Sequence, residues 1–473
     1  MTSRFATHEH HEFLEAAHEA LGSPNLQLAL SRLGETLAAG NRSAFERLPG
    51  SSLLRDRARA IKDETLAHLD EHIEQLERAV TARGGHVHFA SDGADAVAIV
   101  REIIRQAGAS RVVKSKSMVT EEIHLNQALE EAGVEVTETD FGEFIIQVAG
   151  ERPSHIVGPA LHKTAEEMAV CLNERFNENL TKEPHVMAQF ARGHLRRKFA
   201  AADVGITGGN FLVAETGTVV IISNEGNARL TTSVPRIMIS IVGIEKLIPR
   251  FADLPIFLKV LARAATGQKM SIYTSLVTGP RQPGEADGPE ETHLVLLDNG
   301  RSRILGSPMR ESLFCIRCGA CLNICPVYRK IGGHAYGGTY SGPIGAVITP
   351  LFDGHAQNHH QPHASSLCGA CQAACPVKIQ IPELLVRNRA AQHDEHVTPR
   401  GEEFIYRIWN RVLQSPFWYR VLTRTTSRLM SWLAKDGWVK RLPGPLAGWT
   451  SCRDFPAPAK KSFRDQWREE SGR

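Results

Sequence analysis

The sequence lacks any apolar run long enough to cross a lipid bilayer, and its charge is almost balanced. A spanning helix needs about 20 consecutive apolar residues, whereas residues 219–222 and 237–244 have only the length of buried strands. The formal net charge is +3 over 473 residues, which disfavours nucleic acid as a partner. The N-terminus is polar and shows no apolar signal-peptide core, so we expect a cytoplasmic location.

The common nucleotide-binding patterns are also absent. Residues 205–218 are rich in glycine, but their spacing is not that of a dinucleotide fingerprint and no helical pattern follows directly. The stretch contains no Gly-Lys-Ser/Thr and is therefore not a P-loop. Nothing in the chain has the pattern of a flavin or nicotinamide site, so we expect any two-electron cofactor to lie on another protein.

Cysteine, by contrast, is concentrated: seven of the nine cysteines lie in residues 315–375. The first run has the Cys-x-x-Cys-x-x-Cys-x-x-x-Cys-Pro spacing of bacterial ferredoxins, and reads Cys315-Ile-Arg-Cys318-Gly-Ala-Cys321-Leu-Asn-Ile-Cys325-Pro326. The second run repeats it with serine in the first position, and reads Ser365-Ser-Leu-Cys368-Gly-Ala-Cys371-Gln-Ala-Ala-Cys375-Pro376. Small residues between the cysteines let the backbone approach a cluster closely.

In two-cluster ferredoxins the fourth cysteine of each run binds the other cluster. This rule predicts two [4Fe-4S] clusters, with the ligands of cluster 1 being Cys315, Cys318, Cys321 and Cys375. The ligands of cluster 2 are then Cys325, Cys368 and Cys371. Cluster 2 lacks a fourth thiolate, so Ser365, water or a partner's ligand completes it, or it holds only three irons.

Zinc is the alternative use of paired cysteines, but a triple-cysteine run closed by Cys-Pro fits its four-ligand sites poorly. Disulfides are disfavoured by the reducing compartment expected above. The two remaining cysteines, Cys171 and Cys452, are isolated in the sequence, and we expect them to serve in packing.

Four domains are expected from the changes in pattern. Residues 1–85 show helical periodicity and no chemistry of their own, and residues 86–300 alternate short strands with helices. This alternation predicts an α/β domain with a mostly parallel sheet. Within it we expect strands at 86–90, 111–114 and 135–138, and helices at 94–106 and 121–132. Residues 301–395 form the cluster domain and residues 396–473 the C-terminal region.

Two stretches of the α/β domain are candidate sites for an anionic substrate. Lys114 and Lys116 are two residues apart at the end of a predicted strand, before a predicted helix N-terminus, an arrangement that suits an anion; an ordinary strand end is equally consistent. The second stretch carries glycines and short polar residues typical of tight turns, among them Gly208, Asn210, Glu215 and Thr216. A set of hairpin turns without a ligand also fits it.

The cluster domain and the C-terminal region each contain one unusual stretch. Residues 331–346 are almost all small and include His334, which favours a close wrap over a cluster or a docking face, with a flexible loop as the alternative. All six tryptophans lie between Trp409 and Trp467, interleaved with arginines. This pattern suits peripheral membrane contact, a partner-binding patch or a helical cover on the cluster domain.

Together these motifs resemble the lactate utilization protein B family of bacterial iron–sulfur proteins. The similar segments are Lys114-Ser-Lys-Ser-Met118, Thr139-Asp-Phe-Gly-Glu-Phe-Ile-Ile-Gln147, 205–227, Gly332-Gly-His-Ala-Tyr336, Gly342-Pro-Ile-Gly-Ala346, the two cysteine runs and Trp449-Thr-Ser-Cys-Arg-Asp454. The resemblance implies a domain similar to the phosphosugar isomerase and CoA-transferase fold at 86–300. It also implies two four-iron clusters, with serine at 365 as the family's own pattern.

Family members take part in oxidising L-lactate to pyruvate with two partner proteins. The resemblance therefore implies an iron–sulfur electron-transfer subunit that works with two other lactate-utilization subunits and an electron acceptor, and meets the 2-hydroxy acid only indirectly. The alternative is that the α/β domain is itself the oxidoreductase site, with the clusters as its electron sink.

Overall fold

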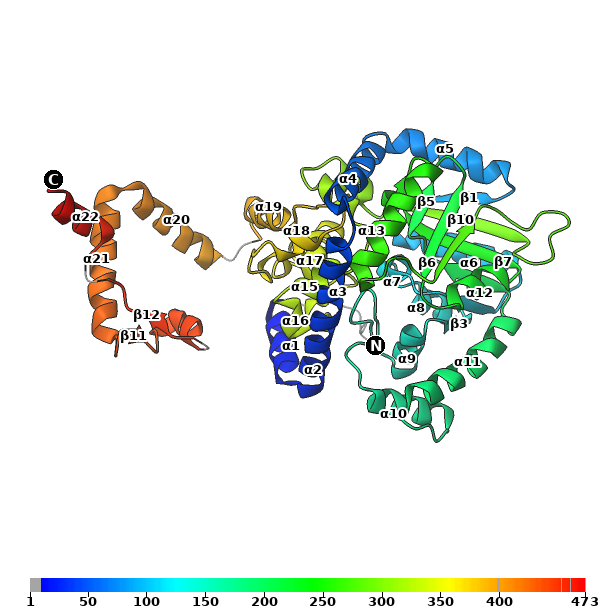
Figure 1. Ribbon diagram of the computed structural model, residues 1–473, viewed down its shortest axis with the longest axis horizontal. Helices are drawn as coiled ribbons and strands as arrows, with labels where there is room; N and C mark the ends of the chain where they lie inside the picture. Colours follow the sequence, from blue (N-terminus) through cyan, green and yellow to red (C-terminus); the bar gives the residue numbers. More distant parts are fainter. Residues whose placement is uncertain (1–9, 398–399, 452, 460, 473) are drawn as a thin grey trace. The chain divides into compact units, whose positions relative to one another are not determined.

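A computed structural model describes residues 10–397, 400–451, 453–459 and 461–472 of the chain (Figure 1). Its internal contacts divide the chain into two units, one extending to Glu395 and the other beginning at His396. The first unit contains both the α/β sheet and the cysteine runs. Cys452 lies outside the described residues.

A six-stranded sheet forms the centre of the first unit. Its order is β1-β10-β7-β4-β2-β3, and every pairing in it is parallel. The strands are β1 (His86–Ala90), β2 (Arg111–Lys114), β3 (Glu135–Glu138), β4 (Val204–Thr207), β7 (Ile237–Gly243) and β10 (Glu291–Leu297). All residues of β4 and β7 are buried, as expected where helices cover both faces. The prediction of a mostly parallel α/β sheet is confirmed.

Helices connect these strands; the one predicted at 94–106 is present as α6 (Gly93–Gln106), and the one predicted at 121–132 needs a correction. The helices are α6 (Gly93–Gln106), α7 (Met118–Glu122), α8 (Leu125–Glu131), α9 (Phe141–Ala149), α10 (Ala165–Phe176), α11 (Pro184–Ala201), α12 (Asn227–Ser233) and α13 (Leu254–Thr266). The single helix predicted at 121–132 is wrong, because His124 has a φ of 52° and separates α7 from α8. A left-handed residue interrupts the helical hydrogen bonding.

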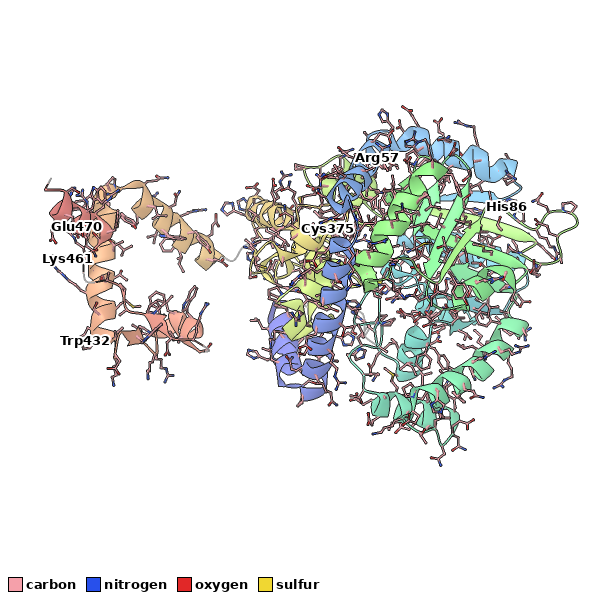
Figure 2. The ribbon with its side chains drawn as sticks, in the orientation of Figure 1. Arg57, His86, Cys375, Trp432, Lys461 and Glu470 are labelled. Atoms are coloured by element: carbon pink, nitrogen blue, oxygen red, sulfur yellow. The ribbon has the colours of Figure 1, made fainter. Side chains whose placement is uncertain are left out.

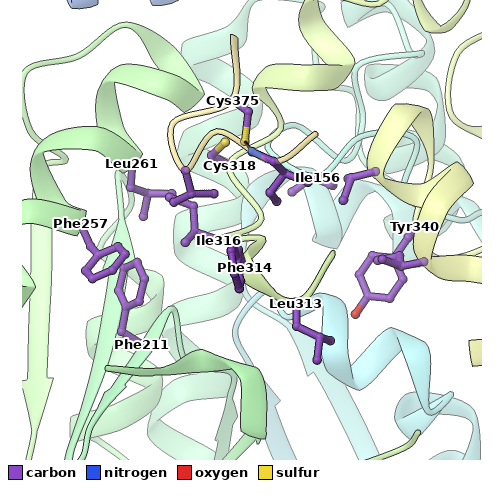
Figure 3. Packing of buried hydrophobic residues seen from close by; sticks show 14 of the residues in the cluster. Ile156, Phe211, Phe257, Leu261, Leu313, Phe314, Ile316, Cys318, Tyr340 and Cys375 are labelled. Carbon is purple, nitrogen blue, oxygen red and sulfur yellow. Dashed lines mark hydrogen bonds between the residues drawn. The ribbon is translucent and has the colours of Figure 1, made fainter. Parts of the chain in front are cut away.

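The glycine-rich stretch forms part of a second, four-stranded sheet. Its strands are β5 (Phe211–Val213), β6 (Thr218–Ser223), β8 (Leu247–Ile248) and β9 (Tyr273–Val277), in the order β8-β5-β6-β9. The turn of the β5–β6 hairpin approaches α5 (Leu69–Ala82) so closely that a Cβ on Gly217 would lie 2.8 Å from the backbone nitrogen of Val80. Phe211 of this sheet packs on Phe257 of α13, with ring centroids 4.9 Å apart (Figure 3).

The N-terminal helices pack on both the sheet and the cysteine runs. They are α1 (His10–Gly22), α2 (Pro24–Leu33), the π-helical turn η1 (Gly34–Ala38), α3 (Ala39–Glu46), α4 (Ser51–Ala67) and α5 (Leu69–Ala82). From α4, Arg55 Nη2 donates to the carbonyl oxygen of Cys375 at 2.6 Å. About two turns further along α4, Lys62 Nζ donates to the carbonyl oxygen of Leu247 at 3.2 Å.

Short helices carry the cysteine runs. They are α14 (Arg301–Leu305), α15 (Ala320–Ile324), α16 (Tyr328–Ile331), α17 (Gly342–Asp353), α18 (Ala370–Ala374) and α19 (Ile381–Asp394). The glycine-rich segment at 331–346 packs tightly, since a Cβ on Gly333 would lie 1.9 Å from the carbonyl oxygen of Ser154. His334, a candidate ligand in the sequence, has its Nε2 2.8 Å from the carbonyl oxygen of Arg152.

The second unit is built from α20 (Arg400–Gln414), α21 (Pro416–Leu433), α22 (Phe463–Ser471) and the short strands β11 (Trp438–Val439) and β12 (Phe455–Pro456). Its large apolar side chains are exposed. Trp432, for example, is 81% exposed near the end of α21 (Figure 2). No helix of the described residues is both long and apolar enough to cross a membrane.

Candidate functional site

Four cysteines come together at a small cavity inside the first unit. The cavity is lined by Cys315, Cys318, Cys321 and Cys375, together with apolar side chains that include Ile156. Figure 3 shows the sulfur atoms of Cys318 and Cys375 facing each other beside Ile156 and Ile316. Cys375 comes from the second run, so this set of residues has the composition that the ferredoxin rule predicts for cluster 1.

The backbone around these sulfurs is arranged to donate to them. The amide of Arg317 donates to Cys315 Sγ at 3.5 Å, and the amide of Ile379 donates to Cys375 Sγ at 3.4 Å. Amide donors to cluster sulfurs are a common means of tuning iron–sulfur sites. Burial and the neighbouring Cys315 raise the pKa of the Cys321 thiol, so thiolates held this close need cations between them. Iron meets that need, and these residues fit an iron–sulfur cluster.

Cys325, Cys368 and Cys371 form the second group. Burial and the nearby Cys325 raise the pKa of Cys371 to about 12, while Cys368 is exposed. The amide of Tyr328 donates to Cys325 Sγ at 3.5 Å. Within the described ranges, no three His, Cys, Asp or Glu side chains approach closely enough to hold a single metal ion.

Basic side chains surround the cluster 1 cysteines. Burial lowers the pKa of Lys62 to about 7 and that of Lys246 to about 8, and Cys315 acts in the opposite direction on both. The Arg317 guanidinium stacks on the Tyr340 ring, 4.2 Å from its centroid. These cations stand where a negatively charged cluster with thiolate ligands would need compensation.

A second cavity, of about 310 Å³, lies where three neighbouring strands of the parallel sheet end. Its lining includes residues that follow β2, β4 and β7, among them Ser117, Gly208 and Lys246. Ligands of open α/β sheets bind beyond the carboxyl ends of the strands, and this volume falls within the range of small-molecule sites.

Lys116 and Arg317 supply unused donors to this second cavity. Both residues line it, and neither Lys116 Nζ nor one terminal nitrogen of Arg317 has a hydrogen-bond partner among the described residues, although both atoms are buried. The buried Asn227 Oδ1, from another lining residue, is an acceptor without a described partner. Buried polar atoms normally have partners, so this cavity suits an anionic ligand that also carries a donor.

The two cavities share a wall. Ile156, Arg317 and Cys318 line both of them. The loop that carries Ile156 is fixed against the cluster domain, because His155 Nε2 lies 3.0 Å from Asn323 Oδ1. A ligand in the larger cavity would therefore lie directly beside a predicted ligand of cluster 1.

The structure separates the candidate residues of the α/β domain. Lys116, Gly208 and Asn210 line the larger cavity, whereas Lys114, Glu215 and Thr216 do not. The three residues outside the cavity are engaged elsewhere in the fold. Lys114 Nζ lies 2.8 Å from Glu138 Oε1. Glu215 Oε2 accepts from the amide of Phe251 at 2.8 Å, and Thr216 Oγ1 lies 2.7 Å from Thr218 Oγ1. Lys114 is fully buried, so it stabilises the fold beneath the cavity rather than facing a ligand.

Three buried carboxylates surround Lys114. Burial opposes its charge, but Glu138, Glu121 and Glu143 together raise the pKa of Lys114. Burial raises the pKa of Glu121 to about 7, and burial with the nearby Glu121 raises that of Glu143 well above its ordinary value. Near neutral pH, Glu121 and Glu143 are therefore at least partly protonated, close to Lys116.

Arg301 connects the cluster domain to the strand ends. It is 1% exposed, and its guanidinium lies 2.6 Å from Glu245 Oε2 and 2.8 Å from Glu122 Oε2. Although burial alone would raise it, the Arg301 charge holds the pKa of Glu245 at about 2. Tyr340 Oη also donates to Glu122 Oε2, at 2.5 Å, so the network fixes one side of the larger cavity.

Comparisons with known proteins decide the family. Residues 73–297 match the LUD domain, residues 311–379 match the 4Fe-4S dicluster domain, and residues 387–472 match the C-terminal region of lactate utilisation protein B. Proteins named lactate utilization protein B are 45% identical in Bacillus velezensis, over 97% of this chain and 96% of that protein, and 43% identical in Bacillus subtilis, over 96% and 95%. The chain belongs to the lactate utilization protein B family.

Membership in the lactate utilization protein B family confirms the resemblance based on the motifs, and the dicluster match supports iron–sulfur clusters at the cysteine runs. A third relative of the same name, from Shouchella clausii, is 45% identical over 96% of each chain. A solved DUF162-family protein from Deinococcus radiodurans aligns with 48% of the chain at 12% identity and a TM-score of 0.28, too low to support an argument about the fold.

Several residues of the site were not predicted from the sequence. Lys246 ends the short turn that follows the buried strand β7, and the rule for strand ends could have identified it. Arg317 lies inside the first cysteine run, and the sequence pattern there assigns a role only to the cysteines. Arg301 and Ile156 have no local signal, because their roles depend on contacts between distant segments.

Proposed function

We propose that this chain is the electron-transfer subunit of a system that oxidises L-lactate to pyruvate, together with two other lactate-utilization proteins. The observation that supports it best is the pair of cysteine groups, with Cys375 joining the cysteines of the first run at one cavity. Bound [4Fe-4S] clusters supply one-electron transfer steps. Lactate oxidation releases two electrons, so two clusters in one domain suit a relay from a two-electron site to a single-electron acceptor.

This chain's own residues provide the surroundings such a relay needs. Backbone amides donate to Cys315 and Cys375, and Arg317 lies beside the cluster 1 cysteines in the wall of the larger cavity. Apolar side chains enclose those cysteines on the remaining sides, among them Ile316 and Ile379. Such a shell limits access of water to the cluster, which is one means of setting its potential.

The test is electron paramagnetic resonance on anaerobically purified protein, before and after L-lactate is added. With the partner proteins present, we expect lactate to reduce the clusters of this chain; without them, we expect no reduction. Reduction of the isolated chain by lactate would refute the relay and make this chain the catalyst. Clusters that stay oxidised even with the partners and lactate would refute any electron-transfer role.

A second function is favoured by the larger cavity. Its unused donors, Lys116 and Arg317, suit a carboxylate, and Asn227 Oδ1 suits the hydroxyl of a 2-hydroxy acid. The raised pKa of Glu121 places a carboxyl nearby that exchanges protons near neutral pH. In this alternative the α/β domain would oxidise the 2-hydroxy acid, the two released protons would pass to nearby carboxyls and solvent, and the two clusters would take one electron each, both through the wall shared with cluster 1.

Equilibrium binding separates these functions. If the cavity takes a 2-hydroxy acid, L-lactate binds the isolated full chain saturably and Lys116→Met weakens that binding at least about tenfold, the loss of one charged hydrogen bond. Lys182→Met is the control, since Lys182 is an exposed lysine paired with Glu166 on the surface. Absence of saturable lactate binding would refute the second function and leave the relay intact.

We also propose that the C-terminal unit contacts a membrane surface and that the electron acceptor of the relay lies there. Residues 396–473 contain 15 Arg and Lys against seven Asp and Glu, together with all six tryptophans. Trp409 and Trp418 are more than half exposed, and exposed aromatics with basic residues suit an anionic membrane interface. We expect co-sedimentation with anionic but not with neutral vesicles, and its loss in Trp409→Ala/Trp418→Ala. Equal binding to both kinds of vesicle would refute the role of the basic residues, and binding to neither would favour a protein partner for this surface.

A further inference from the structure

The two halves of the cluster domain repeat one local backbone structure. Gly319 precedes α15 with a φ of 74° and a ψ of −2°, and Gly369 precedes α18 with a φ of 79° and a ψ of −6°. Each helix ends at an extended cysteine, Cys325 with a ψ of 122° and Cys375 with a ψ of 121°. Corresponding positions of the two halves can therefore be compared directly, including the position where serine replaces cysteine.

Ser365 is the counterpart of Cys315, and its oxygen takes the same hydrogen bond. In the first half the amide of Arg317 donates to Cys315 Sγ at 3.5 Å. In the second half the amide of Leu367 donates to Ser365 Oγ at 3.1 Å. The difference in length is that expected between sulfur and oxygen acceptors. The Ser365 oxygen is thus held by the turn in the same relation to the chain as a cluster 1 ligand.

The turn that holds Ser365 is strained. Leu367 has a φ of 53° and Arg317 a φ of 57°, and for such residues the left-handed region costs about 1–2 kcal/mol. Leu367 is 36% exposed, so burial of its side chain offers little compensation. Backbone strain of this kind is concentrated at functional sites. In the first half this strained turn holds Cys315. The second half keeps the same strained turn, although serine stands at the corresponding position.

We propose that Ser365 Oγ is the fourth ligand of cluster 2, beside Cys325, Cys368 and Cys371. On binding, the Oγ–H proton passes to solvent and an Oγ–iron bond forms; no electron is transferred. The neighbouring hydroxyl, Ser366, is engaged with the Cys368 sulfur. Cluster 2 would then be a four-iron cluster with one oxygen ligand, chemically distinct from the all-cysteine cluster 1.

Mössbauer spectroscopy of the full chain, loaded anaerobically with 57Fe, tests the ligand without relying on activity. The wild type is expected to show one iron of cluster 2 in an oxygen-containing environment, as a component separate from the thiolate-bound irons. In Ser365→Cys this component disappears while the iron content stays the same. Ser366→Ala, the matched control on the same turn, keeps it.

Ser365→Ala gives a second, independent measurement. After mild oxidation we expect cluster 2 of this variant to lose one iron and show the paramagnetic signal of a three-iron cluster, whereas the wild type and Ser366→Ala do not. A wild type that already contains a three-iron cluster would overturn the proposal. It would also be overturned if Ser365→Cys left the Mössbauer components unchanged, since the fourth ligand would then come from elsewhere.

Discussion

Replacing Arg301 by methionine tests how the cluster domain is joined to the sheet. Methionine keeps an apolar chain near Phe352, over which the Arg301 guanidinium lies at 4.9 Å. It removes the cation that Glu122 and Glu245 share and leaves Glu245 only the longer ion pair to Arg317, at 3.7 Å. Removing one partner from a buried ion pair costs about 3–5 kcal/mol. Glu122 keeps hydrogen bonds from Asn299, at 2.7 Å, and from Tyr340, so we expect Glu245 to carry most of the cost.

The cost has a ceiling and a pH dependence. A buried carboxylate that has lost its close cation can take up a proton, and the free energy of that protonation limits the total destabilisation. For a glutamate with an ordinary pKa, protonation costs about 3.7 kcal/mol at pH 7 and about 1.4 kcal/mol less for each lower pH unit. In the wild type, Arg301 holds the pKa of Glu245 at about 2, against the burial that would raise it. Because this pKa is depressed on folding, the pair's contribution is complete above the unfolded pKa and is lost only as the pH falls toward 2.

Thermal unfolding followed by circular dichroism at pH 8, 7 and 6 measures both effects. We expect Arg301→Met to melt about 4 °C below the wild type at pH 7, at about 1.2 °C per kcal/mol for a unit that extends to Glu395, with the difference shrinking as the pH falls. Arg303→Met is the control, because Arg303 is exposed on the same helix and donates to the Leu351 carbonyl oxygen. A difference that does not change with pH, or one no larger than that of Arg303→Met, would refute the reasoning.

Two further predictions follow from the packing and the ligand groups. Gly333→Ala should destabilise the chain by about 1–3 kcal/mol, because its Cβ would lie 1.9 Å from the Ser154 carbonyl oxygen. Gly401 has open space around it, so Gly401→Ala should melt like the wild type. Equal melting temperatures of the two variants would contradict this prediction. Cys371→Ala should lower the iron content by up to about half, whereas Cys171→Ala should leave it unchanged; equal iron in the two variants would count against the ligand assignment.

The sequence predicts most of the fold, because its strands are marked by composition. The buried run at 237–243 is almost entirely β-branched or apolar, and that pattern specifies a central parallel strand. The strand at 204–207 is not predicted, because it leads into the glycine-rich stretch whose composition is typical of tight turns. The break between α7 and α8 has no such signal, since His124 is an ordinary residue in a helical pattern and only its φ of 52° reveals the interruption.

The candidate site was predictable only in part. Lys114 and Lys116 are two residues apart, and side chains at that spacing share a face only inside a strand. Because β2 ends at Lys114, Lys116 is not bound by this rule. Lys114 is buried against Glu138, and Lys116 reaches the cavity. The other cations of the cavity come from segments about 130 to 200 residues away, and no local pattern encodes contacts of that range.

The contact between Arg55 and the carbonyl oxygen of Cys375 spans 320 residues of sequence. At about 5–20 residues per second of synthesis, roughly 16 to 64 s pass between the appearance of one partner and that of the other. The helix made early must wait, undocked, until the second cysteine run has left the ribosome. Each predicted ligand set includes at least one cysteine of the second run, so neither set is complete before the end of this interval, and the clusters and the docking of α4 become possible at the same stage of synthesis.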